Sequence, residues 1–72
     1  MEWNTNISEM PYGDELLLKV KYKVLPFYMF HLCEKHGYMG EEDRIMLTET
    51  EEELTSEAEI IAWINLEKEN KL

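Results

Sequence analysis

The sequence has one cysteine, two prolines and three glycines in 72 residues. A single cysteine excludes an intramolecular disulfide, and this usage is typical of a reducing, intracellular compartment. A chain of this length buries only ~60% of its unfolded surface, so we expect a modest core. Small folds without a disulfide often gain stability by self-association or by docking on a partner.

Long apolar runs are also missing. The longest, VLPFYMF at 24–30, contains Pro26 and is far shorter than the ~20 residues of a membrane span. The first ten residues have neither a basic start nor an apolar segment, so no secretory signal is expected. We therefore expect a single domain over 1–72, located in the cytoplasm and without a membrane partner.

Basic residues are scarce: the sequence has seven lysines and arginines and sixteen aspartates and glutamates, which gives a net charge of -9. Such a surface repels nucleic acid, so no direct nucleic-acid partner is expected, and it favours encounter with basic proteins. The acids concentrate in 41–59, whereas 16–36 holds four of the lysines. A hydrophobic content of 44% with 11% aromatics still predicts a folded chain.

Residues 16–24 alternate between apolar side chains and lysines, which predicts a half-buried strand with its lysines in water. Segment 27–36 fits two structures. Pro26 and Gly37 are spaced to begin and end a helix, whereas the aromatics favour a strand with Tyr28, Phe30 and Leu32 on one face. Both alternatives remain open at this stage.

Two further strands are predicted, at 44–49 and 59–67. Between them, Thr50 with Glu53, or Ser56 with Glu59, has capping-box spacing and predicts a helical turn at 50–57. The predicted fold class is therefore α+β and β-rich: a small antiparallel sheet of three or four strands with one short helical element. Because sequential strands usually pair, we expect a meander.

Catalytic and metal-binding motifs are sparse. His31, Cys33 and His36 could offer metal ligands, but a structural zinc site usually has four. No glycine-rich phosphate loop or nucleophile elbow is present. We expect no catalytic residues, no metal and no cofactor, and keep a thiol or metal enzyme using Cys33 and His36 as a third hypothesis.

The lysines at 19, 21 and 23 lie on one strand face and could contact phosphates, with Tyr22 and Phe27 as stacking platforms. Tyr22, however, belongs to the opposite, core-facing side. The interpretation we favour is solvated lysines on an edge strand that discourage aggregation.

The acidic run from Glu41 to Glu59 has three interpretations: a solvated surface, an electrostatic lure for a basic protein, or a mimic of DNA phosphates. Mimicry needs rows of acids on extended chain, and such a row is about half as dense as one DNA strand. An exposed aromatic, Tyr38 or Tyr28, would add anchoring. The predicted partner-binding residues are Glu49, Glu51, Glu52, Glu53, Glu57, Glu59 and Tyr38.

Both ends of the chain carry a recurring pattern: Trp-Asn-Thr at 3–5, Pro11, and Ile-Ala-Trp at 61–63 followed by Leu66. In this the chain resembles a loose group of small uncharacterised phage and prophage proteins. The two tryptophans are expected to pack a small sheet from its two ends. The resemblance implies a phage or prophage origin, and such an origin favours a host-directed inhibitor in the host cytoplasm. Together with the acidic run, this predicts binding to a basic protein surface, for example of a nucleic-acid-binding defence complex. The alternative is a structural or assembly domain, possibly homodimeric, whose acidity serves only solubility.

Overall fold

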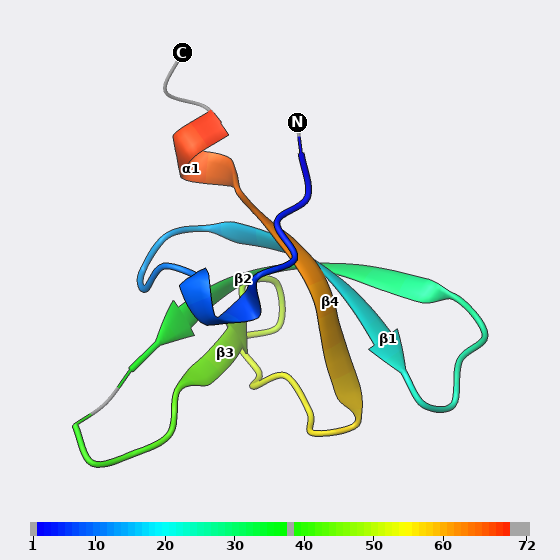
Figure 1. The fold of residues 1–72 in the computed structure, drawn as a ribbon. Helices are drawn as coiled ribbons and strands as arrows, with labels where there is room; N and C mark the ends of the chain where they lie inside the picture. The colour runs from blue at the N-terminus through cyan, green and yellow to red at the C-terminus, as the bar shows by residue number, and fades with distance from the viewer. Residues whose placement is uncertain (1, 38, 70–72) are drawn as a thin grey trace.

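The alternating segment at the start of the body forms the centre of a single antiparallel sheet (Figure 1). The computed structural model describes residues 2–37 and 39–69. The elements are η1 (Ile7–Glu9), β1 (Leu16–Tyr22), β2 (Tyr28–His36), β3 (Arg44–Leu47), β4 (Ala58–Asn65) and α1 (Leu66–Glu69). The predicted fold class, a small β-rich sheet with short helical structure, is confirmed. Within the described residues, no helix has the length and apolar character needed to cross a membrane.

The strand order is β3-β2-β1-β4, with every neighbouring pair antiparallel. The first three strands form the predicted meander, but the fourth does not pair with β3. Instead, the connection 48–57 carries the chain across to the free side of β1, which gives a Greek key. The prediction of a simple meander was therefore wrong for β4, because pairing order is not encoded in the local pattern of any one strand.

Segment 27–36 is a strand, which settles the two alternatives. β2 pairs with β1 over residues 28–33 and with β3 on its other side over residues 33–36, so each part of the strand is hydrogen-bonded to a neighbour. Pro26 lies in the turn between β1 and β2, where the amide of Leu25 donates to the carbonyl oxygen of Tyr22 at 3.2 Å. Hydrogen bonding to β1 on one side and to β3 on the other stabilises the strand, although Pro26 and Gly37 have the spacing that favoured a helix.

The helical turn predicted at 50–57 is not formed. The hydroxyl of Thr50 accepts a hydrogen bond from the amide of Glu52 (3.3 Å), a local contact that closes a turn instead of capping a helix. Glu51 takes a left-handed conformation with φ 58°. Leu54 is the one large apolar residue in the segment, so a helix there would have had no apolar face to bury. The short helical elements are η1 and α1.

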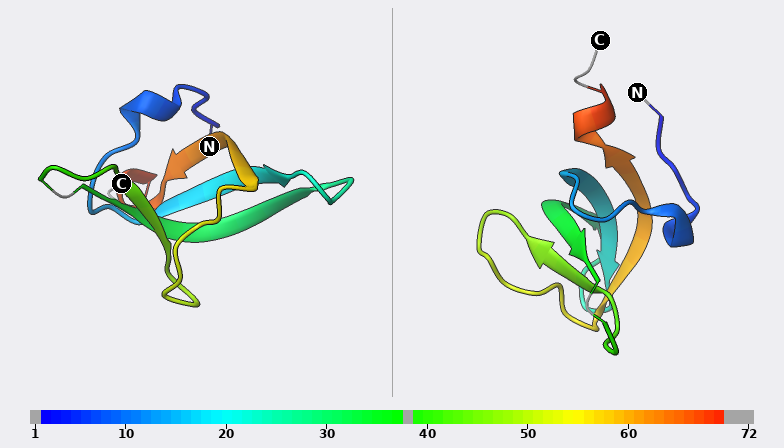
Figure 2. Two further views of the ribbon diagram at one scale, coloured as in Figure 1. Left: turned by 90° about the horizontal axis from the view of Figure 1, so that it is seen from below. Right: turned by 90° about the vertical axis from the view of Figure 1, so that its left-hand side faces the viewer.

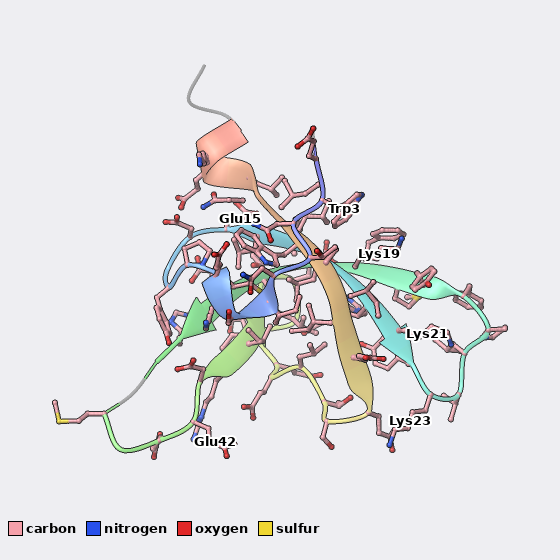
Figure 3. All side chains as sticks on the ribbon, in the orientation of Figure 1. Trp3, Glu15, Lys19, Lys21, Lys23 and Glu42 are labelled. Atoms are coloured by element: carbon pink, nitrogen blue, oxygen red, sulfur yellow. The ribbon has the colours of Figure 1, made fainter. Side chains whose placement is uncertain are left out.

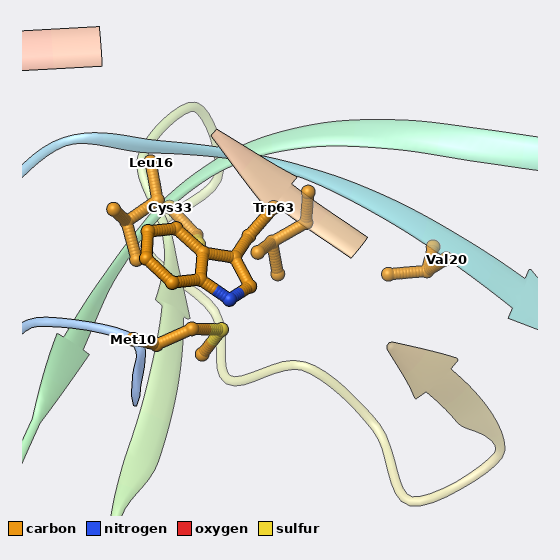
Figure 4. Close-up of a cluster of buried hydrophobic side chains, with 6 residues drawn as sticks. Met10, Leu16, Val20, Cys33 and Trp63 are labelled. Atoms are coloured by element: carbon orange, nitrogen blue, oxygen red, sulfur yellow. The ribbon is translucent and has the colours of Figure 1, made fainter. Parts of the chain in front are cut away.

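One side of the sheet, the core face, holds the main buried cluster (Figure 4). Its strand residues are Leu16, Leu18, Val20, Cys33 and Trp63, and Met10 from the N-terminal segment covers them. Leu54 packs against this cluster from the connection after β3. The half-buried strand predicted from the alternation is thereby confirmed over residues 16–22, with Leu16, Leu18 and Val20 fully buried. The predicted strand extended too far, because Val24 lies in the turn after β1 and is exposed.

The N-terminal segment runs beside β4 (Figure 2). Asn4 and Trp63 exchange two backbone hydrogen bonds of 2.9 Å, and the indole nitrogen of Trp63 donates to the carbonyl oxygen of Asn6 at 2.9 Å. Trp3 turns to the other side of the sheet, where its ring lies 5.9 Å from that of Phe30. The prediction that the tryptophans pack the sheet from two ends was wrong: they occupy opposite faces beside the same strand.

The side of the sheet opposite the core face is called the second face. By strand alternation it carries Leu17, Lys19, Lys21, Tyr28, Phe30, Leu32, Ala62 and Ile64, with Trp3 beside Ile64. Ala62 and Ile64 are buried, but Tyr28 and Phe30 are 48% and 54% exposed. A bulge at Ile61 keeps Ile60 on the core side and Glu59 beside Lys21.

Candidate functional site

The acids of 41–53 gather around β3. Residues 52–54 fold back along this strand through hydrogen bonds from Leu47 N to Glu52 O and from Leu54 N to Ile45 O, both 2.8 Å. As a result, Glu53 joins the acids that precede β3 in lining a shallow depression. We call the exposed glutamates of this region the acidic edge: Glu41, Glu42, Glu49, Glu51, Glu52 and Glu53. Figure 3 labels Glu42, in the loop before β3.

Few cations balance the acidic edge. Arg44 approaches Glu41 at 3.5 Å, and the buried Lys35 approaches Asp43 at 3.7 Å. Across 2–37 and 39–69, no ion pair includes the side chains of Glu49, Glu51, Glu52 or Glu53. These four carboxylates therefore present their charge to solvent or to a partner.

Glu57 and Glu59 lie elsewhere. They border a hollow together with Lys21 and Lys23, and Glu59 is the cross-strand neighbour of Lys21. Opposite charges on paired strands offset each other, so these two acids add little to the field of the acidic edge. The predicted set of glutamates is thus divided into two groups by the fold.

The rows of acids that phosphate mimicry requires are not present at 49–53. Residues 48–50 form a turn and Glu51 is left-handed, so Glu49, Glu51 and Glu53 do not project from one extended strand. Of the two aromatics considered as anchors, Tyr38 lies outside the described residues. Tyr28 lies on the second face.

Asp43 anchors the acidic loop to the body. Its carboxylate accepts a hydrogen bond from the Tyr12 hydroxyl (2.8 Å) and lies near Lys35, whose ammonium also donates to the Met10 carbonyl oxygen at 3.2 Å. The Tyr12 ring sits 4.5 Å from the same ammonium. A side chain at Gly37 would meet this ring, because an added Cβ would lie 2.8 Å from it. The start of the acidic edge is therefore held in place.

This contact predicts an altered titration of Tyr12. Its pKa is raised, first by the hydrogen bond to Asp43, then by burial and by the negative charge of the same carboxylate. Asp43→Ala should move the pKa back down, since the neutral phenol loses its acceptor. Absorbance of tyrosinate against pH, with Tyr12→Phe to identify the signal, measures the shift. An unchanged titration in Asp43→Ala would show that the contact is not formed in solution.

The lysines of β1 occupy the second face, and β1 is a central strand. The interpretation as edge-strand lysines was therefore wrong, since β4 covers the second side of β1. The ammonium of Lys19 lies 4.4 Å from the centre of the Tyr28 ring, and that of Lys21 donates to the carbonyl oxygens of Tyr22 and Leu25. Lys19 and Lys21 are thus already engaged within the chain, and they border aromatic rings.

His31, Cys33 and His36 do not converge. His31 and Cys33 share the core face, where the His31 ring is hydrogen-bonded to the Tyr22 hydroxyl at 2.9 Å. His36 lies on the other side of the strand and pairs with Glu34 at 3.3 Å. Burial, with a contribution from Glu34, raises the pKa of the Cys33 thiol to about 12. A thiol that stays protonated is a poor nucleophile and a poor metal ligand.

Two surfaces therefore remain as binding candidates: the acidic edge, which the sequence analysis named in large part, and the aromatic second face, which it did not. Trp3 and Phe30 are 27 positions apart in sequence, and only the pairing of the N-terminal segment with β4 brings them together. Comparisons of the chain with protein-family models, with curated proteins and with solved structures gave no match.

Proposed function

We propose that the protein is a non-enzymatic binding protein that docks its acidic edge on a basic surface of another protein. The observation that carries this proposal is the exposure of four glutamates, at 49 and 51–53, outside any ion pair of the described residues. Opposite potentials on two proteins speed their encounter and fix their relative orientation.

The lysines support the same proposal by their location. Lys19 and Lys21 lie on the second face and Lys35 lies in its buried contact, while the acidic edge follows β3 at the margin of the sheet. Lys23 lies in the turn after β1, and Lys68 lies in α1. This separation leaves the edge with a strongly negative local field within the ~8 Å over which charges act at physiological salt. A basic partner can approach it without meeting the lysines.

The turn at 48–51 favours general electrostatic occupation over a replica of phosphate spacing, because the acids point from a loop and not from one straight row. The resemblance of the two ends of the chain to small phage proteins adds a host protein as the proposed partner class. A nucleic-acid-binding host protein has the kind of basic surface that such an edge would occupy.

The test begins with a capture experiment from a host lysate at low salt, followed by identification and purification of the retained protein. Affinity is then measured from about 50 to about 500 mM salt. In the variant with Glu49, Glu51, Glu52 and Glu53 changed to glutamine, we expect binding to weaken at least about tenfold, with a shallower salt dependence.

A matched variant separates local from global charge. Changing Glu2, Glu9, Glu57 and Glu59 to glutamine alters the net charge by the same amount, from -9 to -5, but leaves the acidic edge intact. All four are exposed, so neither variant should lose its fold. Equal loss of affinity in both variants, or an affinity indifferent to salt, would contradict the assignment of the acidic edge.

A further inference from the structure

The second face has an ordered arrangement of apolar and charged side chains. An apolar row crosses the sheet at one level: Leu32 of β2 is paired with Leu17 of β1, which is paired with Ile64 of β4. Trp3 extends this row, since the pairing of Asn4 with Trp63 places it beside Ile64. Phe30 lies one level further along and contacts Trp3.

Charges of opposite sign flank this row. On one side, Lys19 and Lys21 follow Leu17 on β1. On the other side, Glu15 precedes Leu17 by two positions and Glu34 follows Leu32 by two, so alternation places both on the second face. Figure 3 shows the order along β1 from Glu15 to Lys19 and Lys21. Along the strands the face is therefore acidic, then apolar, then basic through Lys19 and Lys21, with Glu59 beside Lys21 at the far end.

We propose that the second face binds a second copy of this chain about a twofold axis that lies in the plane of the face, along the apolar row. A half-turn about this axis lays Leu17 against the partner's Leu17 and reverses the strand direction. Glu15 then faces the partner's Lys19, and Lys19 faces the partner's Glu15. Ile64 is already buried within one chain, so Leu17, Leu32 and Trp3 make the apolar contact with their counterparts, and each charged contact occurs twice.

A second copy suits this face better than other occupants. A basic surface would meet the lysines and an acidic surface would meet the glutamates, in each case with repulsion on one side of the row. A nucleic acid would meet Glu15 and Glu34 as well as the net charge of -9. Only a partner with the reversed order of charges matches both sides, and the rotated chain has that order.

The fold also supplies the reason for association. A sheet face that carries apolar side chains is generally buried against another layer, and here the second face leaves Trp3, Tyr28 and Phe30 between 38% and 54% exposed. About half of three aromatic side chains is ~300 Å² of mainly apolar surface. Stable interfaces bury ~800 Å² per partner, so with the flanking side chains we expect a concentration-dependent dimer of moderate affinity.

The test is sedimentation equilibrium of the full chain from about 1 µM to about 500 µM, a range that covers moderate affinities. The wild-type protein should shift from monomer to dimer. Glu15→Lys and Lys19→Glu should each weaken dimerisation at least about tenfold, because each places like charges at both symmetric contacts.

Charge complementation makes the test specific. Mixing Glu15→Lys with Lys19→Glu should form a heterodimer, since both contacts again join opposite charges, and the double variant should recover the homodimer. Circular dichroism verifies that each variant is folded. A wild-type monomer throughout the range, or folded single variants that fail to associate when mixed, would overturn the proposal. Of the acidic edge, Glu51 shares a hollow with Glu34 and His36 at the margin of this face. The dimer test changes Glu15 and Lys19 whereas the test of the proposed function changes Glu49 and Glu51–Glu53, so failure of one proposal is distinguishable from failure of the other.

Discussion

Trp63→Ala is expected to remove a large part of the protein's stability. Trp63 is 7% exposed, packs among the buried residues of the core face, and its indole nitrogen holds the N-terminal segment through the carbonyl of Asn6. Truncation of a buried tryptophan costs about 3–5 kcal/mol. A chain of this length has a total stability of roughly 4–11 kcal/mol, so this loss is a large part of the whole.

Urea denaturation followed by circular dichroism measures the loss. Trp3→Ala is the matched control, because it removes the same side chain from the second face, where Trp3 is 38% exposed. That variant should lose only about 1 kcal/mol, and its remaining Trp63 fluorescence reports unfolding. If Trp63→Ala kept a cooperative transition within about 1 kcal/mol of wild type, the indole would not be the centre of the core.

A strand could be predicted wherever the residues of that one segment show an apolar alternation or an enrichment in aromatic side chains. The alternation in 16–22 specified both β1 and the faces of its residues, and the aromatics of 28–36 gave the correct face assignment once a strand was assumed. The ambiguity of β2 came from Pro26 and Gly37, which mark turns at the ends of a strand as well as the ends of a helix. The β partners on both sides, which decided the matter, lie outside that segment.

Long-range relationships were not predictable in the same way. The pairing of β4 with β1 depends on where the connection 48–57 crosses, and its local signals indicated a helix. Thr50 does make a capping-type hydrogen bond, but to close a turn. The same pairing order turned the lysines of β1 from edge residues into the basic side of a central face, and it placed Trp3 beside Ile64.

The two candidate surfaces differ in how far they could be predicted, because one consists of residues close in sequence and the other is formed by strand pairing. The acidic edge was largely visible because its glutamates are close in sequence, although only the fold separates them from Glu57 and Glu59. The second face is assembled from four segments, namely β1, β2, β4 and the N-terminal segment, and no single segment shows the arrangement alone. The order acidic, apolar, basic along the strands becomes visible only when the register of β1 with β2 and β4 is known.

Alkaline pH should destabilise the wild-type protein through Cys33. The thiol is fully buried, and burial, helped by the charge of Glu34, raises its pKa from an ordinary 9.0 to about 12. Below pH 9 both the folded and the unfolded chain keep the proton, so the thiol has no effect on the pH dependence of stability. Between pH 9 and 12 the unfolded chain loses the proton while the folded chain retains it, so the free energy of unfolding falls as pH rises.

The expected slope approaches 1.4 kcal/mol per pH unit, or a loss of about 3 kcal/mol by pH 11. Tyrosines and lysines titrate in the same range, so the quantity to follow is the difference in unfolding free energy between wild type and Cys33→Ala. At neutral pH the alanine variant should be the less stable by about 1 kcal/mol, because it leaves a small cavity. As pH rises through 9 the difference should shrink and reverse, since only the wild type then has a buried thiol that gains by unfolding. A difference that stayed constant to about pH 11 would mean that Cys33 ionises as readily in the folded chain as in the unfolded one, and that the core face is open to water beside β2.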